Sequence, residues 1–258
     1  MPYQEILVNA QEIATIALNR PHRRNALTGT MMQEIVQALH ELDQDDTVKV
    51  VIIKGAGSSF CAGAELGELI NGEDILQKRQ QKIDVVNMLT TVSRIGKIVI
   101  AQVEGFALAG GCGLAVACDM VVASETAQFG LPEVNRALFP MIVMAPISRA
   151  IGWKKGMEMY FTGEFLSGRQ AAEQGLANYV VAPEELELKT QELAAQIAVK
   201  SAVTIRLGKE AFYNMRDMEY FKALQYLKDM LLVTTFTEDA QEGINAFLEK
   251  RSPQWKGK

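Results

Sequence analysis

The stretch Gly105–Glu133, GFALAGGCGLAVACDMVVASETAQFGLPE, carries the strongest structural signals in the sequence. It follows an apolar run, Ile98–Val103, that is typical of a buried strand. The pair Gly110–Gly111 then precedes a short helix of small residues predicted over Cys112–Cys118. Glycine allows a tight turn and a close approach to the backbone, and the first N–H groups of a helix lack intrahelical partners. This helix start can therefore hold a phosphate or the negative oxygen of a carbonyl under attack.

The same stretch ends in a carboxylate, Glu133, which is a candidate base. We predict a strand at Met120–Ala123 and place Glu133 on a loop after it. Its neighbours Phe129, Leu131 and Val134 predict an apolar pocket, and desolvation in such a pocket raises the pKa of a glutamate toward neutrality. A carboxyl group with that pKa suits proton transfer.

The composition is that of a globular protein, with 258 residues of which 48% are hydrophobic and 22% charged. This length is enough for one large domain or two small ones with a sizeable core. The net charge of −5 argues against nucleic acid as a partner. No run of about 18 apolar residues is present to span a membrane, and the amino terminus lacks the pattern of a signal peptide. We therefore expect neither nucleic acid nor a membrane as a partner.

The cysteines and histidines do not predict a metal site. Cys61, Cys112 and Cys118 are odd in number and lack metal-ligand spacing, and the chain has only two histidines. We expect a reducing, cytoplasmic compartment and no metal ion. A nucleophilic thiol needs a base such as histidine, and no motif places one beside Cys61 or Cys112. We interpret both as small packing residues.

Hydrophobic periodicity predicts the remaining elements. The predicted strands are Glu5–Val8, Ile13–Leu18 and Val48–Ile53, and the last of these reads as buried on both sides. The predicted helices are Thr30–Leu42 with a cap at Thr28, Ile75–Ile95, one that starts at Ser167 and stops at Gly175, Glu184–Lys200, Ala202–Tyr213, Glu219–Thr234 and Asp239–Glu249. From Pro146 the chain is expected to be mostly helical, with a break at Leu176–Val181. Strand-turn-small-residue units recur near Gly55, Gly105 and Ser124, which suggests stacked strand-strand-helix units followed by a helical tail.

An ordered set of motifs resembles the crotonase family, the enoyl-CoA hydratase/isomerase superfamily. The motifs are Asn19-Arg-Pro, Asn25-Ala-Leu27, Phe60-Cys-Ala-Gly-Ala-Glu-Leu66, Ala107-Leu-Ala-Gly-Gly-Cys-Gly-Leu114, Ala117-Cys-Asp119, Phe129-Gly-Leu-Pro-Glu133, Tyr160-Phe-Thr-Gly163 and Phe247-Leu-Glu-Lys-Arg251. The resemblance implies an α/β crotonase (ClpP-like) fold, a spiral of repeated ββα units over residues 1–195. It also implies a C-terminal helical trimerisation region over residues 196–258, in a homotrimer or a hexamer of two trimers.

The resemblance also implies an acyl-CoA thioester as the substrate, with coenzyme A as part of that substrate and no separate cofactor. The thioester carbonyl is expected between two backbone N–H groups, which match those of Ala62 and Gly110 here. Glu133 matches the glutamate that gives or takes a proton at the acyl chain. Preorganised amide donors of this kind stabilise the enolate-like oxygen, and losing one costs about 2.7–4 kcal/mol of barrier.

The remaining site residues are expected to hold coenzyme A. His22, Arg23 and Arg24 lie where the family's substrate loop passes and carry charge that suits anionic phosphates; a solvated basic turn is the alternative. Ala64, Glu65 and Leu66 match the loop that wraps the pantetheine and adenine. By resemblance, Phe247 and Lys250 reach the coenzyme from the C-terminal helix, of the same or a neighbouring subunit; otherwise they are core and surface residues.

The chain departs from the family pattern at two places. The best-known hydratases carry a second glutamate directly after Gly-Gly-Cys, where this chain has Gly113. Glu65 or Glu68 could stand in for it, but both are expected to face solvent. The loop Phe139–Met144 replaces a glycine-rich run, and its Met141, Ile142, Val143 and Met144 either line an acyl pocket or belong to the core. Single-glutamate members include Δ3-Δ2-enoyl-CoA isomerases and also some hydratases.

We therefore expect an enoyl-CoA hydratase (a lyase) or a Δ3-Δ2-enoyl-CoA isomerase of fatty acid metabolism, with an oxyanion hole and one glutamate acid/base. Two alternatives remain open at this point. One is another enolate reaction of the family, decarboxylation or thioester hydrolysis. The other is a non-catalytic acyl-CoA-binding paralogue, since a fold can persist without its chemistry.

Overall fold

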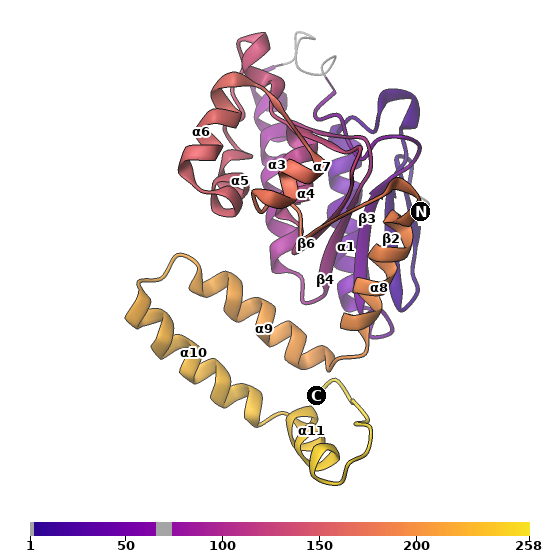
Figure 1. Cartoon of the computed structure of the whole chain (residues 1–258), viewed down its shortest axis with the longest axis vertical. Coiled ribbons are helices and arrows are strands. Elements are labelled where there is room, and N and C mark those ends of the chain that lie inside the picture. The colour runs from indigo at the N-terminus through magenta and orange to yellow at the C-terminus, as the bar shows by residue number, and fades with distance from the viewer. Residues whose placement is uncertain (1–2, 66–73) are drawn as a thin grey trace.

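Two β-sheets organise the chain in the computed structural model, which describes residues 3–65 and 74–258 (Figure 1). The larger sheet has the strand order β1-β2-β3-β4-β6-β9, and the smaller has the order β5-β7-β8. The strands β1 and β2 are antiparallel, whereas the other pairs of the larger sheet are parallel. The strands are β1 Ile6–Asn9, β2 Ile13–Leu18, β3 Val50–Gly55, β4 Ile98–Val103, β5 Phe106–Leu108, β6 Met120–Ser124, β7 Gln128–Gly130, β8 Phe165–Ser167 and β9 Tyr179–Val181.

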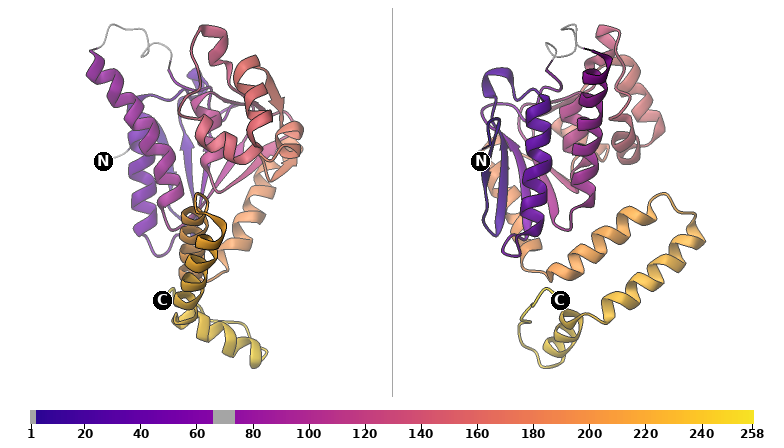
Figure 2. Two further views of the ribbon diagram at one scale, coloured as in Figure 1. Left: turned by 90° about the vertical axis from the view of Figure 1, so that its left-hand side faces the viewer. Right: turned by 180° about the vertical axis from the view of Figure 1, so that it is seen from behind.

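Helices cover both faces of the larger sheet. They are α1 Gly29–Gln44, α3 Ile75–Arg94, α4 Gly110–Ala117, α5 Met144–Ile151, α6 Trp153–Thr162, α7 Gly168–Glu173, α8 Leu186–Ala198, α9 Ala202–Met215, α10 Tyr220–Thr235 and α11 Glu238–Leu248, with 3-10 turns η1 Pro21–Arg23, η2 Pro132–Arg136 and η3 Pro183–Glu185. Figure 2 shows α1 and α3 side by side on one face, and α8 packs on the other against β2, β3, β4 and β6.

The apolar sequence of β3 explains this arrangement. Val51 and Ile53 belong to the main core on the α1 and α3 side, whereas Val50 and Ile52 belong to a smaller core beneath α8. All four side chains are at most 1% exposed, so the prediction of a strand buried on both sides is confirmed.

Strand-strand units of the kind predicted from sequence recur along the chain. Each of β4 and β6 runs in the larger sheet and is followed by a strand of the smaller sheet, β5 or β7. Close packing of a glycine on a serine carbonyl recurs, locally at Gly55 and between separate segments at Gly105 and Gly168. A Cβ on Gly55, Gly105 or Gly168 would lie 2.0–2.1 Å from the carbonyl oxygen of Ser59, Ser58 or Ser124, so only glycine fits.

The sequence analysis missed the smaller sheet. Its strands β5, β7 and β8 have three residues each, which is too short for a period of two to be recognised. Glu133 was predicted on a loop but lies in the 3-10 turn η2. The two predicted helix caps, Thr28 and Ser167, are confirmed, since each side chain accepts a hydrogen bond from the first turn of its helix.

The last three helices form an arm that extends away from the sheets (Figures 1 and 2). The predicted domain boundary at residues 195–196 falls in the last turn of α8, and the division itself stays a prediction. A buried ion pair attaches the arm to the body: Lys209 Nζ of α9 lies 2.6 Å from Asp119 Oδ2. The ammonium also donates to the carbonyls of Val92 and Lys97, and Tyr213 Oη donates to Asp119. No helix within the described ranges is long and apolar enough to cross a bilayer.

Replacing Lys209 should destabilise the protein strongly. In Lys209→Met the Asp119 carboxylate keeps its buried position but loses its cation, and breaking a buried pair in this way costs about 3–5 kcal/mol. The control is Lys228→Met, because the Lys228–Asp229 pair is more than 60% exposed and such pairs contribute about 0–1 kcal/mol. Urea unfolding measures both values. Equal losses in the two variants would contradict the assigned role of Lys209.

Candidate active site

The amino terminus of α4 presents a free amide at a sharply turned backbone. The residue before the helix, Ala109, has φ +50° and ψ −122°, a conformation that costs energy for a residue with a side chain. Its own N–H donates to the carbonyl of Gly130. The next N–H, that of Gly110, opens the helix and has no partner among the described residues. The helix therefore begins two residues earlier than predicted, and its first residue is the predicted donor.

The loop 61–65 lies directly against this helix start. A Cβ on Gly111 would lie 2.4 Å from the carbonyl oxygen of Cys61, and one on Gly63 would lie 2.7 Å from Cβ of Ala109. Gly63 also has φ +97°, which glycine adopts without strain. The same Cβ position on Gly63 lies 3.6 Å from the amide nitrogen of Gly110. The two glycine motifs that are 47 residues apart in sequence thus meet at one point.

The predicted role of Ala62 is wrong. Its N–H donates to the carbonyl of Arg24 at 2.9 Å and is therefore not available to a substrate oxygen. The neighbouring amides alternate in direction, because Leu27 pairs with Ala64 in a parallel bridge. Leu27 donates to the Gly63 carbonyl and Glu65 donates to the Leu27 carbonyl, whereas the N–H of Ala64 has no partner in the described part of the chain. Ala64, predicted to contact coenzyme A, is thus one of two residues of this loop, with Gly63, whose N–H has no partner among the described residues.

Glu133 carries an unsatisfied buried oxygen. Its Oε2 is buried and accepts no hydrogen bond from the described residues. Burial raises the pKa of Glu133, and Arg136 and the residue's own backbone N–H oppose that rise. Burial raises the pKa of the Cys112 thiol to about 12, and the charge of Glu133 contributes to that rise. The carboxylate therefore lies within electrostatic reach of α4, as a base for this site requires.

The space beside Gly113 is filled by an apolar side chain. A Cβ at position 113 would lie 2.3 Å from Cγ1 and 2.8 Å from Cβ of Val143. Val143 is 4% exposed and caps the start of α5. The loop that replaces the glycine-rich run thus occupies the place that a longer residue after Cys112 would need. Of the four residues expected either to line a pocket or to belong to the core, Val143 belongs to the core, Ile142 and Met144 are half-buried, and Met141 is exposed.

The predicted coenzyme residues lie in different surroundings. His22, Arg23 and Arg24 are exposed on and after η1, and the Arg24 guanidinium lies 5.1 Å from the centre of the Phe106 ring. Glu65 does not face solvent as expected: its carboxylate pairs with Arg20 at 3.3 Å. Leu66 and Glu68 lie outside the described residues.

Phe247 and Lys250 are not brought to this site by their own chain. They lie at the end of α11 on the arm, away from α4 (Figure 1), and Phe247 is 82% exposed. The cysteines Cys61, Cys112 and Cys118 are buried and free, and burial raises the pKa of each thiol, which disfavours the nucleophilic thiolate. No cluster of metal-ligating side chains occurs within residues 3–65 and 74–258.

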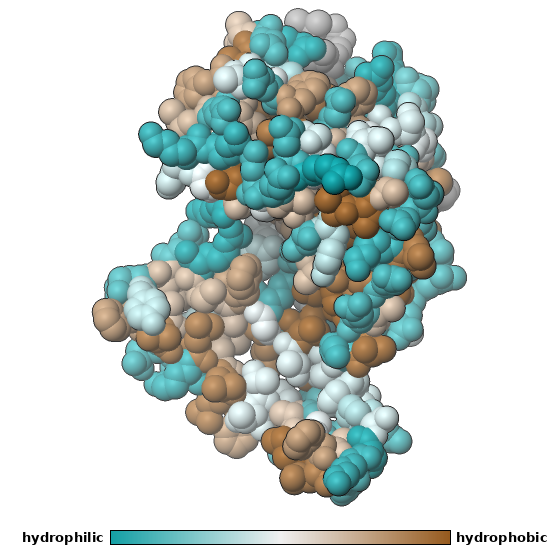
Figure 3. All heavy atoms as spheres, in the orientation of Figure 1, coloured by the Kyte–Doolittle hydropathy of each residue, from teal (hydrophilic) through white to brown (hydrophobic). Residues whose placement is uncertain are grey.

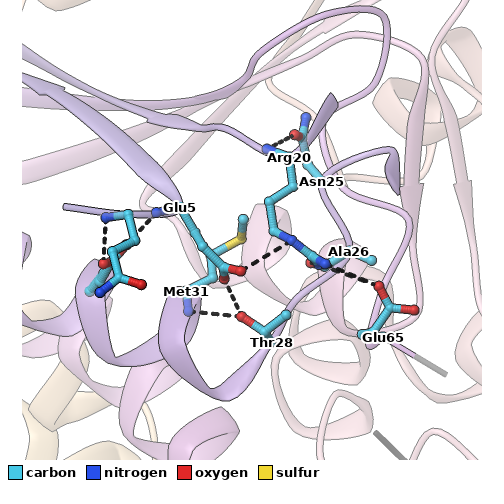
Figure 4. A network of polar contacts seen from close by, with 9 residues as sticks. Glu5, Arg20, Asn25, Ala26, Thr28, Met31 and Glu65 are labelled. Atoms are coloured by element: carbon cyan, nitrogen blue, oxygen red, sulfur yellow. Dashed lines mark hydrogen bonds and ion pairs between the residues drawn. The ribbon is translucent and has the colours of Figure 1, made fainter. Parts of the chain in front are cut away.

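Sequence reasoning missed the polar residues that hold the loops. Asn25 is fully buried with φ +54°, accepts from the N–H of Arg20, and donates to the carbonyls of Ala56 and Ser59 at 2.9 and 2.7 Å. Figure 4 shows Arg20 between Glu5 and Glu65. Both residues stand in motifs quoted above, but only their three-dimensional partners show their roles.

Comparison with known proteins points to one family and confirms the fold that the resemblance implied. A family model described as enoyl-CoA hydratase/isomerase matches residues 9–258. A probable enoyl-CoA hydratase of Mycobacterium bovis is 35% identical over 257 residues, which is 99% of each chain. The mitochondrial enoyl-CoA hydratase domain-containing protein 3 of Mus musculus is 37% identical over 250 residues, covering 94% of this chain and 81% of that protein. Because this relative is mitochondrial, the cytoplasmic location stays a prediction.

Solved structures match over nearly the full length. The crystal structure of human enoyl coenzyme A hydratase domain-containing protein 3 has a TM-score of 0.95 at 31% identity, covering 98% of this chain and all of that one. The crystal structure of an enoyl-CoA hydratase of Mycobacterium smegmatis has a TM-score of 0.94 at 31% identity, covering 98% and 99%.

The contact between Gly113 and Val143 can be tested by stability. Gly113→Ala places a methyl group inside Val143, and overpacking of this kind costs about 1–3 kcal/mol. Adding Val143→Ala should recover part of that loss, so the two changes should not be additive in urea unfolding. Gly208→Ala serves as the control, because nothing lies within 4 Å of that Cβ position and alanine is favoured in a helix. Simple additivity at positions 113 and 143 would contradict the packing described.

Proposed function

The chain belongs to the enoyl-CoA hydratase/isomerase family, and we propose that it is an enzyme that moves the double bond of an enoyl-CoA thioester. The observation that carries this proposal is a buried carboxylate oxygen of Glu133 near a helix start with a free amide, neither of which has a hydrogen-bond partner among the described residues. A buried polar group without a partner is costly and marks a place where a ligand completes the hydrogen bonds.

The thioester carbonyl oxygen is proposed to accept hydrogen bonds from Ala64 and Gly110. Both N–H groups are free of partners among the described residues, and Gly63 holds the two segments in contact. The dipole of α4 adds partial positive charge at Gly110. These fixed donors act most strongly on the oxygen that becomes negative when a proton leaves the neighbouring carbon.

Glu133 then serves as the base. In a 3-enoyl thioester its carboxylate takes a proton from C2, the carbon between the carbonyl and the double bond. The electron pair of the broken C2–H bond spreads over C2, C4 and the carbonyl oxygen, which the two amides hold. The same carboxyl group returns the proton to C4, which leaves the double bond between C2 and C3. Proton number and charge balance, and no second protein group is needed.

The packing at Gly113 supports proton transfer over water addition. The two-carboxylate scheme holds one water between two glutamates, and Val143 occupies the space beside the position where the second would stand. Burial of an apolar side chain there leaves Glu133 as the one carboxylate of the proposed scheme. Hydration is the second candidate, and the names of the relatives, probable enoyl-CoA hydratases, are what favour it.

The two reactions are distinguished by substrates in deuterated water. We expect the enzyme to convert 3-hexenoyl-CoA to 2-hexenoyl-CoA, as read by the ultraviolet absorbance of the conjugated thioester, while mass spectrometry reads any deuterium taken up at C4. Glu133→Gln should lower kcat by about 10²–10⁴-fold, because that is the usual contribution of a general base. The exposed Glu164→Gln is the matched control and should keep full activity. A 3-hydroxyacyl product from crotonyl-CoA, lost in Glu133→Gln, would favour hydration instead; unchanged turnover in that variant would exclude Glu133 as the base.

The pH dependence provides a second check on Glu133. Because its pKa is raised and the ionised form takes the proton, kcat/KM should fall with decreasing pH from a point above the ordinary glutamate range. The folded chain binds this proton more tightly than the unfolded chain does, so ionisation at neutral pH lowers stability. Glu133→Gln should therefore be more stable than the parent at pH 7, with the gain lost below the unfolded pKa.

We also propose that the arm assembles the chain into a homotrimer. Large apolar side chains of the arm are exposed in the single chain, among them Phe221 at 71% and Leu231 at 66% in α10 and Phe236 at 75% directly after it (Figure 3). An apolar surface of this extent indicates an interface. In that assembly Phe247 and Lys250 of one subunit would contact the coenzyme bound by its neighbour, together with His22, Arg23 and Arg24 of the latter.

The assembly is tested by light scattering. We expect a mass of three, or in a pair of trimers six, times the 28.4 kDa of one chain. Phe236→Glu should dissociate it, because a charge in an apolar interface loses its hydration. Gln225→Glu adds the same charge at an exposed polar position of α10 and should leave the mass unchanged. A parent protein of 28.4 kDa would contradict the proposal.

A further inference from the structure

One half-buried guanidinium joins three separate segments next to the proposed carbonyl site. Arg20 Nε lies 3.2 Å from Oε1 of Glu5, and its two terminal nitrogens lie 3.4 and 3.3 Å from Oε2 of Glu65. One of these nitrogens also donates to the carbonyl of Ala26 at 2.8 Å. The side chain of Arg20 is 16% exposed, and those of Glu5 and Glu65 are each 21% exposed. Figure 4 shows all three partners converging on Arg20.

Two of these contacts end beside the free amide of Ala64. Ala26 precedes Leu27 and Glu65 follows Ala64, and Leu27 and Ala64 are the two members of the parallel bridge. The bridge itself consists of only two hydrogen bonds, of 2.7 and 2.9 Å. Arg20 therefore connects the outer ends of both strands of this bridge and restrains the peptide plane that contains the Ala64 N–H.

The charges explain why a single arginine is required here. Two carboxylates, Glu5 and Glu65, face one cation, so without Arg20 two half-buried negative charges would lie near each other and would repel. Glu5 also accepts a hydrogen bond from the hydroxyl of Thr28, which caps α1 and fixes that carboxylate in place. Among the described residues the Glu65 carboxylate pairs only with Arg20, so it is the group that would move. A lysine cannot replace the planar fork, which contacts three oxygens at once.

We propose that Arg20 is a positioning residue that orients the Ala64 amide toward the thioester carbonyl by holding Glu65 and Ala26. This inference rests on the proposed function, since it assigns Arg20 to the donor pair Ala64 and Gly110. Arg20 itself does not touch the substrate. Its effect is expected in the transition state, where the donor geometry matters most, rather than in the binding of coenzyme A.

The test uses Arg20→Lys and Glu65→Gln in the full-length protein. Glu65→Gln keeps Arg20 on Glu5 and Ala26 and so retains two of the three contacts, which protects folding. We expect kcat to fall about 10- to 100-fold in each, as misplacement by about 1 Å does, with KM changed by less than about threefold. Because both act through one contact, the double variant should be no slower than the slower single variant.

A spectroscopic measurement separates positioning from a merely structural role. The infrared stretch of a ¹³C-labelled thioester carbonyl, bound as crotonyl-CoA, falls in frequency when amide donors polarise it. We expect this shift in the parent, a smaller shift in both variants, and the full shift in Arg169→Gln. Arg169 is the control because its ion pair with Glu125 is exposed.

The outcomes distinguish this inference from the proposed function. A parent protein without any carbonyl shift would overturn the donor pair and this inference together. A shifted parent with equally shifted variants would overturn the inference alone. A raised KM with an unchanged shift and kcat would also overturn it, because Arg20 would then contact the coenzyme directly.

Discussion

The site depends on a close backbone approach that only glycine permits. The loop 61–65 and the start of α4 are in contact because Gly63 and Gly111 have no Cβ, and any side chain there would overlap Ala109 or Cys61. This contact brings two free amides together although their residues belong to different turns of the spiral. Successive turns pack through the same kind of contact, glycine against a serine carbonyl, at Gly105 and Gly168. The fold and the site thus share one steric rule.

Polar groups around the site are divided between support and chemistry. Arg20 donates to the carbonyl of Ala26, and Asn25 donates to the carbonyls of Ala56 and Ser59. These bonds hold the loop after β2 against the loop after β3. In contrast, one carboxylate oxygen of Glu133 is buried and has no hydrogen-bond partner among the described residues. Such a group lowers stability, whereas the hydrogen bonds that Asn25 and Arg20 make stabilise the loops. Val143 packs an apolar side chain against α4 at Gly113.

Long elements were predictable from sequence and short ones were not. The β-branched run of β3 and the capped helices α1 and α7 follow from local patterns, and the structure agrees with them. The strands β5 and β7 depend on pairing with each other, which no local pattern of three residues contains. Gly110 and Glu133 were placed from the motif alone. The choice of Ala62 over Ala64 was wrong because the two are small residues of the same motif, and only the three-dimensional contact shows that the Arg24 carbonyl accepts the N–H of Ala62.

The helix α4 has one further consequence, because its two ends serve different parts of the molecule. Its first residue presents the Gly110 amide, and two residues beyond its last, Asp119 receives the arm through Lys209. Eight residues of α-helix form a rod about 12 Å long. The rod is packed in the main core, so it moves as one piece. The attachment point of the arm and the proposed donor at Gly110 therefore lie at opposite ends of one short helix. In the proposed trimer, a change in how the arms pack would reach the donor through this helix.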